Sequence, residues 1–205
     1  MSYINNFLSL NCAGDVLNVI PKHNYNHKEI TESWAMIRQI KPITLDKKLH
    51  YDIIDLCAGN AITSVLSAFI LPVRYSYAID KQKRSGKYEN VKKFSYREID
   101  IYNDGLMLNL HSLSQNAILI SVHPCKTLAE RIIEIYNNSK APYLFLMPCC
   151  IDPGKLDPFI ASEIDKYTAW CFYLLELIKD SHVKMVRDRQ ILSPCNIIIM
   201  AERKG

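Results

Sequence analysis

The chain has 205 residues, 49% of them hydrophobic, and a formal net charge of +4. This length fits one well-buried domain and is too short for two, so we predict a single domain over residues 1–205. No apolar stretch suits a membrane span, and the N-terminus does not resemble a secretory signal. The seven cysteines are therefore expected as reduced thiols in a cytoplasm.

The first 50 residues precede the first core strand pattern. A helix is expected over residues 28–39, because Ile30, Trp34 and Ile37 fall on one helical face. Two roles are open for it: capping a ligand pocket or covering one face of a sheet. We treat residues 1–50 as an N-terminal helical cap segment and residues 51–205 as the core.

Residues 51–61 are the most informative stretch of the chain. A buried strand is predicted from Tyr51 to Leu56, and an apolar helix from Ile62 to Leu71. Between them, small residues alternate at Cys57, Gly59 and Ala61. A strand, a tight turn and a helix N-terminus form a place where a ligand can contact backbone N–H groups. The alternative is an ordinary strand-to-helix connection.

A second strand, residues 73–79, ends at Asp80. An acid at this position can accept hydrogen bonds from ribose hydroxyls, although a solvated aspartate is the alternative. The segment Lys81–Lys93 follows, with six basic residues against the single acid Glu89. It either contacts nucleic-acid phosphates or is a solvated loop.

Further strands are expected at residues 94–99, 117–122, 143–147, 183–187 and 196–201. We expect a helix between each pair of the first six strands, including one that starts at a capping box at Thr127 and one over residues 157–179. This alternation predicts an α/β fold: a Rossmann-like, mostly parallel seven-stranded sheet. No room remains for a helix between the last two strands, so they should form a C-terminal antiparallel hairpin.

The ends of the fourth and fifth strands carry His123-Pro124-Cys125 and Pro148-Cys149-Cys150. A histidine near its ordinary pKa can take a proton from a hydroxyl or amine. A cysteine is a nucleophile only where its pKa is lowered, and small buried hydrophobes are the alternative for these cysteines. We assign no metal ligand. Zinc is the alternative, because neighbouring strands could bring together His123, Cys125, Cys149 and Cys150. Against it, no CxxC spacing occurs, and Cys149 and Cys150 could both ligate only after a turn, since adjacent residues of a regular strand point to opposite faces.

The turn Asp55-x-Cys57-x-Gly59-x-Ala61 resembles the acidic-x-Gly-x-Gly-x-Gly turn of class I methyltransferases that use S-adenosylmethionine (SAM). The C-terminal hairpin is also similar to that fold. A dinucleotide-dependent oxidoreductase is the rival, but it requires three glycines and lacks the hairpin.

The two strand-end motifs resemble the His-x-Cys and Cys-Cys methyltransferase-domain family, which includes tRNA 2′-O-methyltransferases that modify the acceptor stem. The resemblance covers residues 51–203. This chain has Lys126 where the family usually has glycine, and Ile151-Asp152 where the tRNA enzymes have two histidines. Their zinc-finger modules are absent from it.

The resemblance implies a methyltransferase with SAM as cofactor and, as acceptor, RNA contacted through the Lys81–Lys93 run. The alternatives are a non-catalytic SAM-binding or interaction protein and a methyltransferase for a small molecule or a protein. Neither membrane association nor an oligomeric state is predicted. The residues implied to face the acceptor are His123, Cys149 and Cys150. The residues implied to hold the cofactor are Asp55, Cys57, Ala58, Gly59, Asn60, Ala61, Asp80, Lys81, Asp100, Ile101, Val122 and His123.

Overall fold

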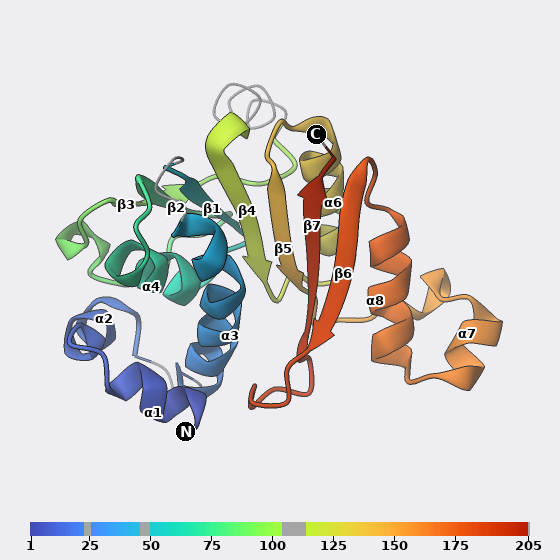
Figure 1. Ribbon diagram of the computed structural model, residues 1–205, viewed down its shortest axis with the longest axis horizontal. Helices are drawn as coiled ribbons and strands as arrows, with labels where there is room; N and C mark the ends of the chain where they lie inside the picture. Colours follow the sequence, from blue (N-terminus) through green and yellow to red (C-terminus); the bar gives the residue numbers. More distant parts are fainter. Residues whose placement is uncertain (23–25, 46–49, 104–113, 205) are drawn as a thin grey trace.

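The computed structural model describes residues 1–22, 26–45, 50–103 and 114–204 (Figure 1). The chain opens with the short helices α1 (Tyr3–Leu8) and α2 (Ala13–Val19) and the long helix α3 (Asn26–Thr44). α3 extends beyond the predicted residues 28–39 at both ends, with Pro42 in its last turn. Among the described helices, none combines the length and apolar character that crossing a membrane requires.

The sheet has seven strands in the order β3-β2-β1-β4-β5-β7-β6. Neighbouring strands from β3 to β5 pair in parallel, whereas β7 pairs antiparallel with both β5 and β6. The predicted fold class, a mostly parallel sheet that ends in an antiparallel hairpin, is confirmed. The strands are β1 (Asp52–Leu56), β2 (Tyr75–Asp80), β3 (Phe94–Glu98), β4 (Ala117–Val122), β5 (Tyr143–Met147), β6 (Ser181–Arg187) and β7 (Ile197–Arg203).

Connections between strands follow the prediction only in part. The helices α4 (Ile62–Ile70) and α6 (Thr127–Asn138) occur as expected, but Lys126 is the N-cap of α6 and no side chain caps it, so the predicted capping box is wrong. The helix expected between β2 and β3 is only the 3₁₀ turn η1 (Tyr88–Asn90). The one expected between β3 and β4 falls on residues 104–113, outside the described part of the chain. Two more 3₁₀ turns are η2 (Ser114–Asn116) and η3 (Pro153–Lys155).

The single helix predicted over residues 157–179 is instead two helices, α7 (Pro158–Glu163) and α8 (Lys166–Glu176). Asp165 adopts an extended conformation between them, and its carboxylate accepts a hydrogen bond from the Thr168 N–H at 2.9 Å. An aspartate that caps a helix start competes with continuation of the preceding helix. The apolar pattern spans the break, which explains the error.

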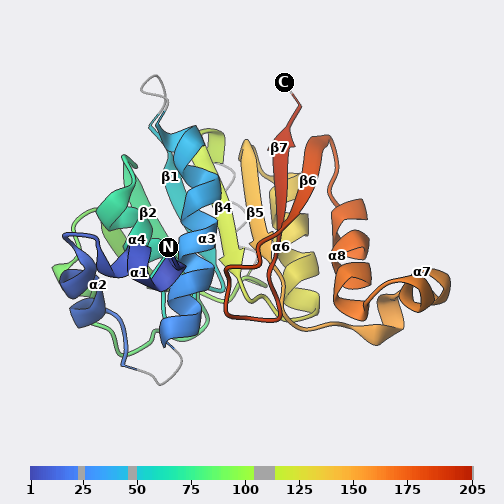
Figure 2. The same cartoon turned by 60° about the horizontal axis from the view of Figure 1, so that its bottom comes forward.

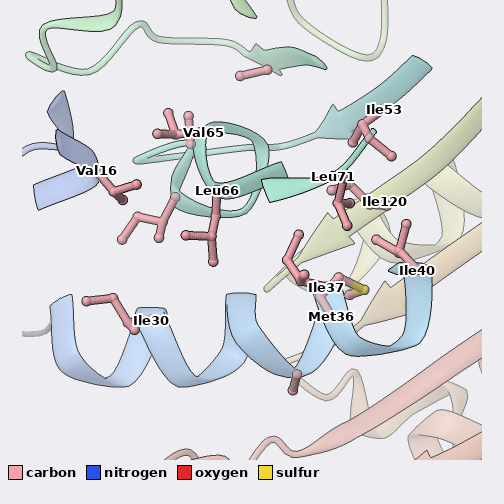
Figure 3. Close-up of a cluster of buried hydrophobic side chains, with 14 of the residues drawn as sticks. Val16, Ile30, Met36, Ile37, Ile40, Ile53, Val65, Leu66, Leu71 and Ile120 are labelled. Carbon is pink, nitrogen blue, oxygen red and sulfur yellow. The ribbon is translucent and has the colours of Figure 1, made fainter. Parts of the chain in front are cut away.

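Two apolar layers cover the two faces of the sheet. One contains α1 to α4, where Met36, Ile37 and Ile40 of α3 pack with Ile53 and Ile120 from the strands (Figure 3). The other contains α6 and α8, packed on alternate strand residues such as Ile54 and Leu119. Because successive side chains of a strand point to opposite faces, one apolar strand supplies both layers.

The order of the strands reverses its direction across the sheet at β1. β1 pairs with β2 on one side and with β4 on the other, so its C-terminal end is the switch point of the sheet. Ligands of open α/β sheets bind in the crevice at such a point. Figure 2 shows α3 passing in front of β1 and β4.

Candidate active site

A cavity of about 520 Å³ opens at the C-terminal ends of β1, β2 and β4. Its wall is formed mainly by the turn after β1, the ends of β2 and β4, and the side of α3, with further residues from α4, α6 and the loop after β2. Seven residues proposed from the sequence for the cofactor site line it. The lining residues are Glu29, Glu32, Ser33, Cys57, Ala58, Gly59, Asn60, Ile62, Thr63, Asp80, Arg84, Val122, His123 and Leu128.

The turn after β1 explains its own sequence pattern. Cys57, Gly59 and Ala61 have positive φ angles of 58°, 51° and 55°. The left-handed region is disfavoured for any residue with a Cβ and free for glycine, so it accounts for Gly59, while Cys57 and Ala61 adopt it at a conformational cost. A Cβ placed on Gly59 would meet no atom within 4 Å, and Gly59 lines the cavity, so its backbone is open to a ligand.

Two stacked tyrosines hold the carbonyl groups of this turn. The Tyr96 hydroxyl donates to the Gly59 carbonyl at 2.7 Å, and the Tyr88 hydroxyl donates to the Asn60 carbonyl at 3.1 Å. The ring centroids are 5.0 Å apart. Burial raises the pKa of both tyrosines, so both hydroxyls remain donors at neutral pH. Sequence reasoning missed both residues, because nothing near them in the chain marks them as partners of the turn.

Asp80 lies at the end of β2 and faces the turn. Its Oδ2 accepts the Gly59 N–H at 2.9 Å, and its Oδ1 accepts the Gln82 N–H at 3.1 Å. Each carboxylate oxygen has two lone pairs, so both retain capacity for a further donor. The carboxylate therefore fixes the turn and also lines the cavity.

Asp55 lies beneath the turn and does not line the cavity. Its Oδ2 accepts a hydrogen bond from the Ser64 hydroxyl at 2.5 Å, and its Oδ1 is buried without a partner among the described residues. Burial raises the pKa of this carboxyl to about 7. Ala61, also proposed as a cofactor residue, is likewise buried and does not line the cavity.

Three more proposed cofactor residues lie outside the cavity lining. The Lys81 ammonium is 3.1 Å from an Asp100 carboxylate oxygen, and both side chains are exposed. The Tyr102 N–H and this ammonium hold the pKa of Asp100 below its ordinary value. Ile101 is buried in the layer formed by α6 and α8.

Helix α3 contributes polar residues that the sequence analysis did not select. Glu29 accepts two hydrogen bonds from the Asn60 side-chain amide, at 3.0 and 3.3 Å. The hydroxyl of Ser33 lies 2.9 Å from that of Thr63, and Glu32 is completely buried. The sequence carries no signal for these residues, because α3 is rich in polar residues and the burial of Glu32 follows only from the packing of the helix. α3 fulfils both roles left open by the sequence: it lines the cavity and covers the sheet.

His123, which is half-buried, and Glu32, which is fully buried, form a polar pair at the β4 side of the cavity. Their Nε2 and Oε2 atoms are 2.7 Å apart, and the His123 side chain is 27% exposed. His123 has a φ of +64°, and its backbone N–H donates to the Met147 carbonyl at 2.9 Å. The imidazole is thus held between a carboxylate and the cavity.

The two proposed catalytic cysteines do not line the cavity. The Cys149 thiol lies behind His123, 3.4 Å from its carbonyl oxygen, and Cys150 is exposed beside it. Burial and the neighbouring thiols raise the pKa of Cys149. A raised pKa keeps this group a thiol at neutral pH, which disfavours a nucleophilic role.

Comparison with known proteins identifies the family. Residues 26–153, more than half of the chain, match a family model described as a methyltransferase domain. This segment contains the turn, Asp80, α3 and His123. A search of curated proteins finds no match.

Solved methyltransferase structures share the fold. The CurJ carbon methyltransferase matches with a TM-score of 0.56 and 14% identity over 87% of this chain. This chain spans about half of that structure, 54% of its length. A bacterial Hen1 methyltransferase domain matches with a TM-score of 0.54 and 11% identity over 87% of this chain and 100% of that domain. The fibrillarin/Nop5p complex gives a TM-score of 0.54 and 14% identity, with 75% of this chain and 73% of that one covered.

The family match, the shared fold and the cavity at the switch point lead to one identification. The chain belongs to this methyltransferase domain family and has the fold of the solved methyltransferases.

Proposed function

We propose that the protein methylates RNA, with the cofactor held between the turn after β1 and Asp80, and with the acceptor entering beside His123. The observation that carries the proposal is that one cavity joins three features: an open turn backbone, a histidine paired with a buried glutamate, and an arginine of the basic run.

The cavity suits the cofactor in size and in charge. Its volume of about 520 Å³ lies within the roughly 300–1,000 Å³ of pockets that hold drug-sized ligands. The acids Glu29, Glu32 and Asp80 line it, and SAM carries positive charge on its sulfur and its amino group. We assign the ribose hydroxyls to Asp80 and the methionine part to the Gly59 backbone.

His123 is assigned to the acceptor. Bound SAM supplies an electrophilic methyl group on a positively charged sulfur. His123 lines the cavity, and in this assignment the ring nitrogen that does not face Glu32 takes the proton from an acceptor hydroxyl as the oxygen attacks. Glu32, beside Nε2, holds the ring orientation and stabilises the imidazolium that forms.

The basic run supports RNA as the acceptor. Arg84 lines the cavity, and Lys81 and Lys83 are exposed next to it on the loop after β2. Lysine and arginine at the mouth of a cavity attract a phosphate backbone and leave the reacting base or sugar inside. This placement favours RNA over an uncharged small molecule.

The test is methyl transfer from labelled SAM to three fractions of a cell extract: RNA, protein and small metabolites. We expect label in RNA, and a steep loss of transfer when Lys83 and Arg84 are both changed to Glu. The matched control is Lys184→Glu, an exposed lysine on the edge strand β6, which should leave transfer unchanged. Label only in protein or in metabolites would contradict RNA as the acceptor, without removing the cofactor assignment.

A further inference from the structure

Three cysteine sulfurs meet behind the wall of the cavity. Cys125 follows β4, and Cys149 and Cys150 follow β5. The Sγ of Cys125 is 3.2 Å from each of the other two, and these two are 3.4 Å apart. No other group of three potential metal ligands this close together was found among the described residues.

The sheet explains why they converge. β4 and β5 are parallel neighbours, with Val122 paired to Met147 at their ends. The segments that leave these ends therefore start side by side. β5 has already ended at Met147, so Cys149 and Cys150 are not on a regular strand and their side chains need not point apart. The condition set by the sequence, that both cysteines could ligate only after a turn away from the strand, is therefore met.

The three thiols lack an acceptor that satisfies them. The thiols of Cys125 and Cys149 approach the same carbonyl, that of His123, at 3.7 and 3.4 Å. The other hydrogen-bond contacts of the three sulfurs within the described residues are with one another. Thiols are weak donors and weak acceptors, so such contacts contribute little. All seven cysteines of the chain are free.

We propose that Cys125, Cys149 and Cys150 bind one Zn²⁺ as thiolates, with the fourth position open to solvent. Zinc–sulfur bonds are about 2.3 Å long, and a sulfur triangle with edges of 3.2 to 3.4 Å has points at that distance from all three atoms. Cys125 and Cys150 are exposed, so the metal has an entry path and room for a fourth ligand. Soft thiolates select thiophilic cations such as zinc over calcium or magnesium.

A metal here would join the ends of β4 and β5. It would lie next to the His123 carbonyl and so restrain the backbone that positions the imidazole. The site rests on these sulfur positions alone and not on the identity of the methyl acceptor.

The test is metal content, because it does not depend on enzymatic activity. The full chain is purified under reducing conditions, incubated with Zn²⁺, freed of excess metal and analysed by mass spectrometry for zinc per chain. We expect one zinc per chain, and loss of that zinc in Cys125→Ser and, independently, in Cys150→Ser. The matched control Cys12→Ser, on a half-buried cysteine before α2, should keep it.

Replacement of zinc by Co²⁺ adds a spectroscopic readout. Thiolate-to-cobalt charge-transfer bands should appear in the wild-type chain and in Cys12→Ser, and be absent from both cluster variants. Zinc retained in both cluster variants would overturn the proposal. So would a fully reduced wild-type chain that binds no zinc, which is the result expected if two of these cysteines serve instead as a disulfide pair.

Discussion

The two sides of the cavity are built differently. The turn side, residues 57–61 with Asp80, is held by backbone geometry and hydrogen bonds to main-chain groups. The His123 side, at the ends of β4 and β5, is held by a buried ion-pairing side chain from α3 and is flanked by thiols. One side is thus fixed by the backbone and the other by side chains from separate elements. Under the proposed function, the first shapes the cofactor site and the second holds the group that reacts.

Removal of the imidazole should give the largest effect. His123→Ala is expected to lower the turnover number by about 10²–10⁴-fold, because the proton acceptor is lost, while SAM affinity changes only a few fold. Steady-state kinetics and calorimetry check this. A lowered melting temperature with binding and turnover falling together would instead make His123 structural.

Glu32 should act through the same imidazole. Glu32→Gln keeps the shape and removes the charge beside Nε2, so its effect should not add to that of His123→Ala in the double variant. Additive losses would show that the two residues act independently.

Asp55 tests the packing under the turn side. Its folded-state pKa of about 7 exceeds its unfolded value, so the folded protein binds the proton more tightly and loses stability as pH rises from about 4 to 7. Asparagine does not titrate, so Asp55→Asn does not lose stability in this way. The free energy of unfolding of the variant, relative to that of wild type, should rise by up to about 4 kcal/mol across that pH window. Denaturant unfolding at several pH values measures it, and parallel pH curves for the two proteins would contradict it.

Gly59 tests the backbone of the turn. Gly59→Val puts a β-branched residue at a φ of +51°, and we expect SAM affinity to fall about a hundredfold or more. Gly59→Ala should lower SAM affinity less, because Ala61 shows that alanine can adopt this left-handed region, at a φ of 55°. Calorimetry on both variants decides this: normal SAM binding by the valine variant would remove the turn from the cofactor site.

Substitution of Lys126, which lies on the His123 side of the cavity, should give the smallest effect. It has φ 47° and ψ −117°, a conformation almost restricted to glycine, at the position where the resembling family usually has glycine. Lys126→Gly should raise the free energy of unfolding by about 1 kcal/mol. Lys126→Ala keeps the Cβ and should not, and equal stabilities of the two variants would show that the backbone is not strained there.

The sequence predicted what depends on local pattern. The strands, the terminal hairpin, the small residues of the turn and Asp80 all follow from residues close together in the chain. The interruption between α7 and α8 at Asp165 was not predicted, because the apolar spacing continues across it. The helix predicted between β2 and β3 was wrong, because a regular alternation of strands and helices was assumed there.

Contacts between distant segments were not predictable. The pairing of Glu32 with His123 depends on where α3 lies relative to the end of β4, and that of Tyr88 and Tyr96 with the turn depends on where η1 and β3 lie relative to it. The convergence of Cys125 with Cys149 and Cys150 depends on where β5 ends. A single sequence gives the residue types of such sites but not the distances between them.

The most direct test of the central claim is a calorimetric titration of SAM into the wild-type chain and into Asp80→Ala. Loss of the carboxylate removes an acceptor for the ribose hydroxyls, which costs about 1.5–3 kcal/mol, so we predict binding by wild type and roughly ten- to hundredfold weaker binding by the variant. Because Asp80 also accepts the Gly59 N–H, the variant's fold is checked by thermal unfolding. No SAM binding by the wild-type chain, or unchanged affinity in Asp80→Ala, would contradict the account of this cavity as the cofactor site.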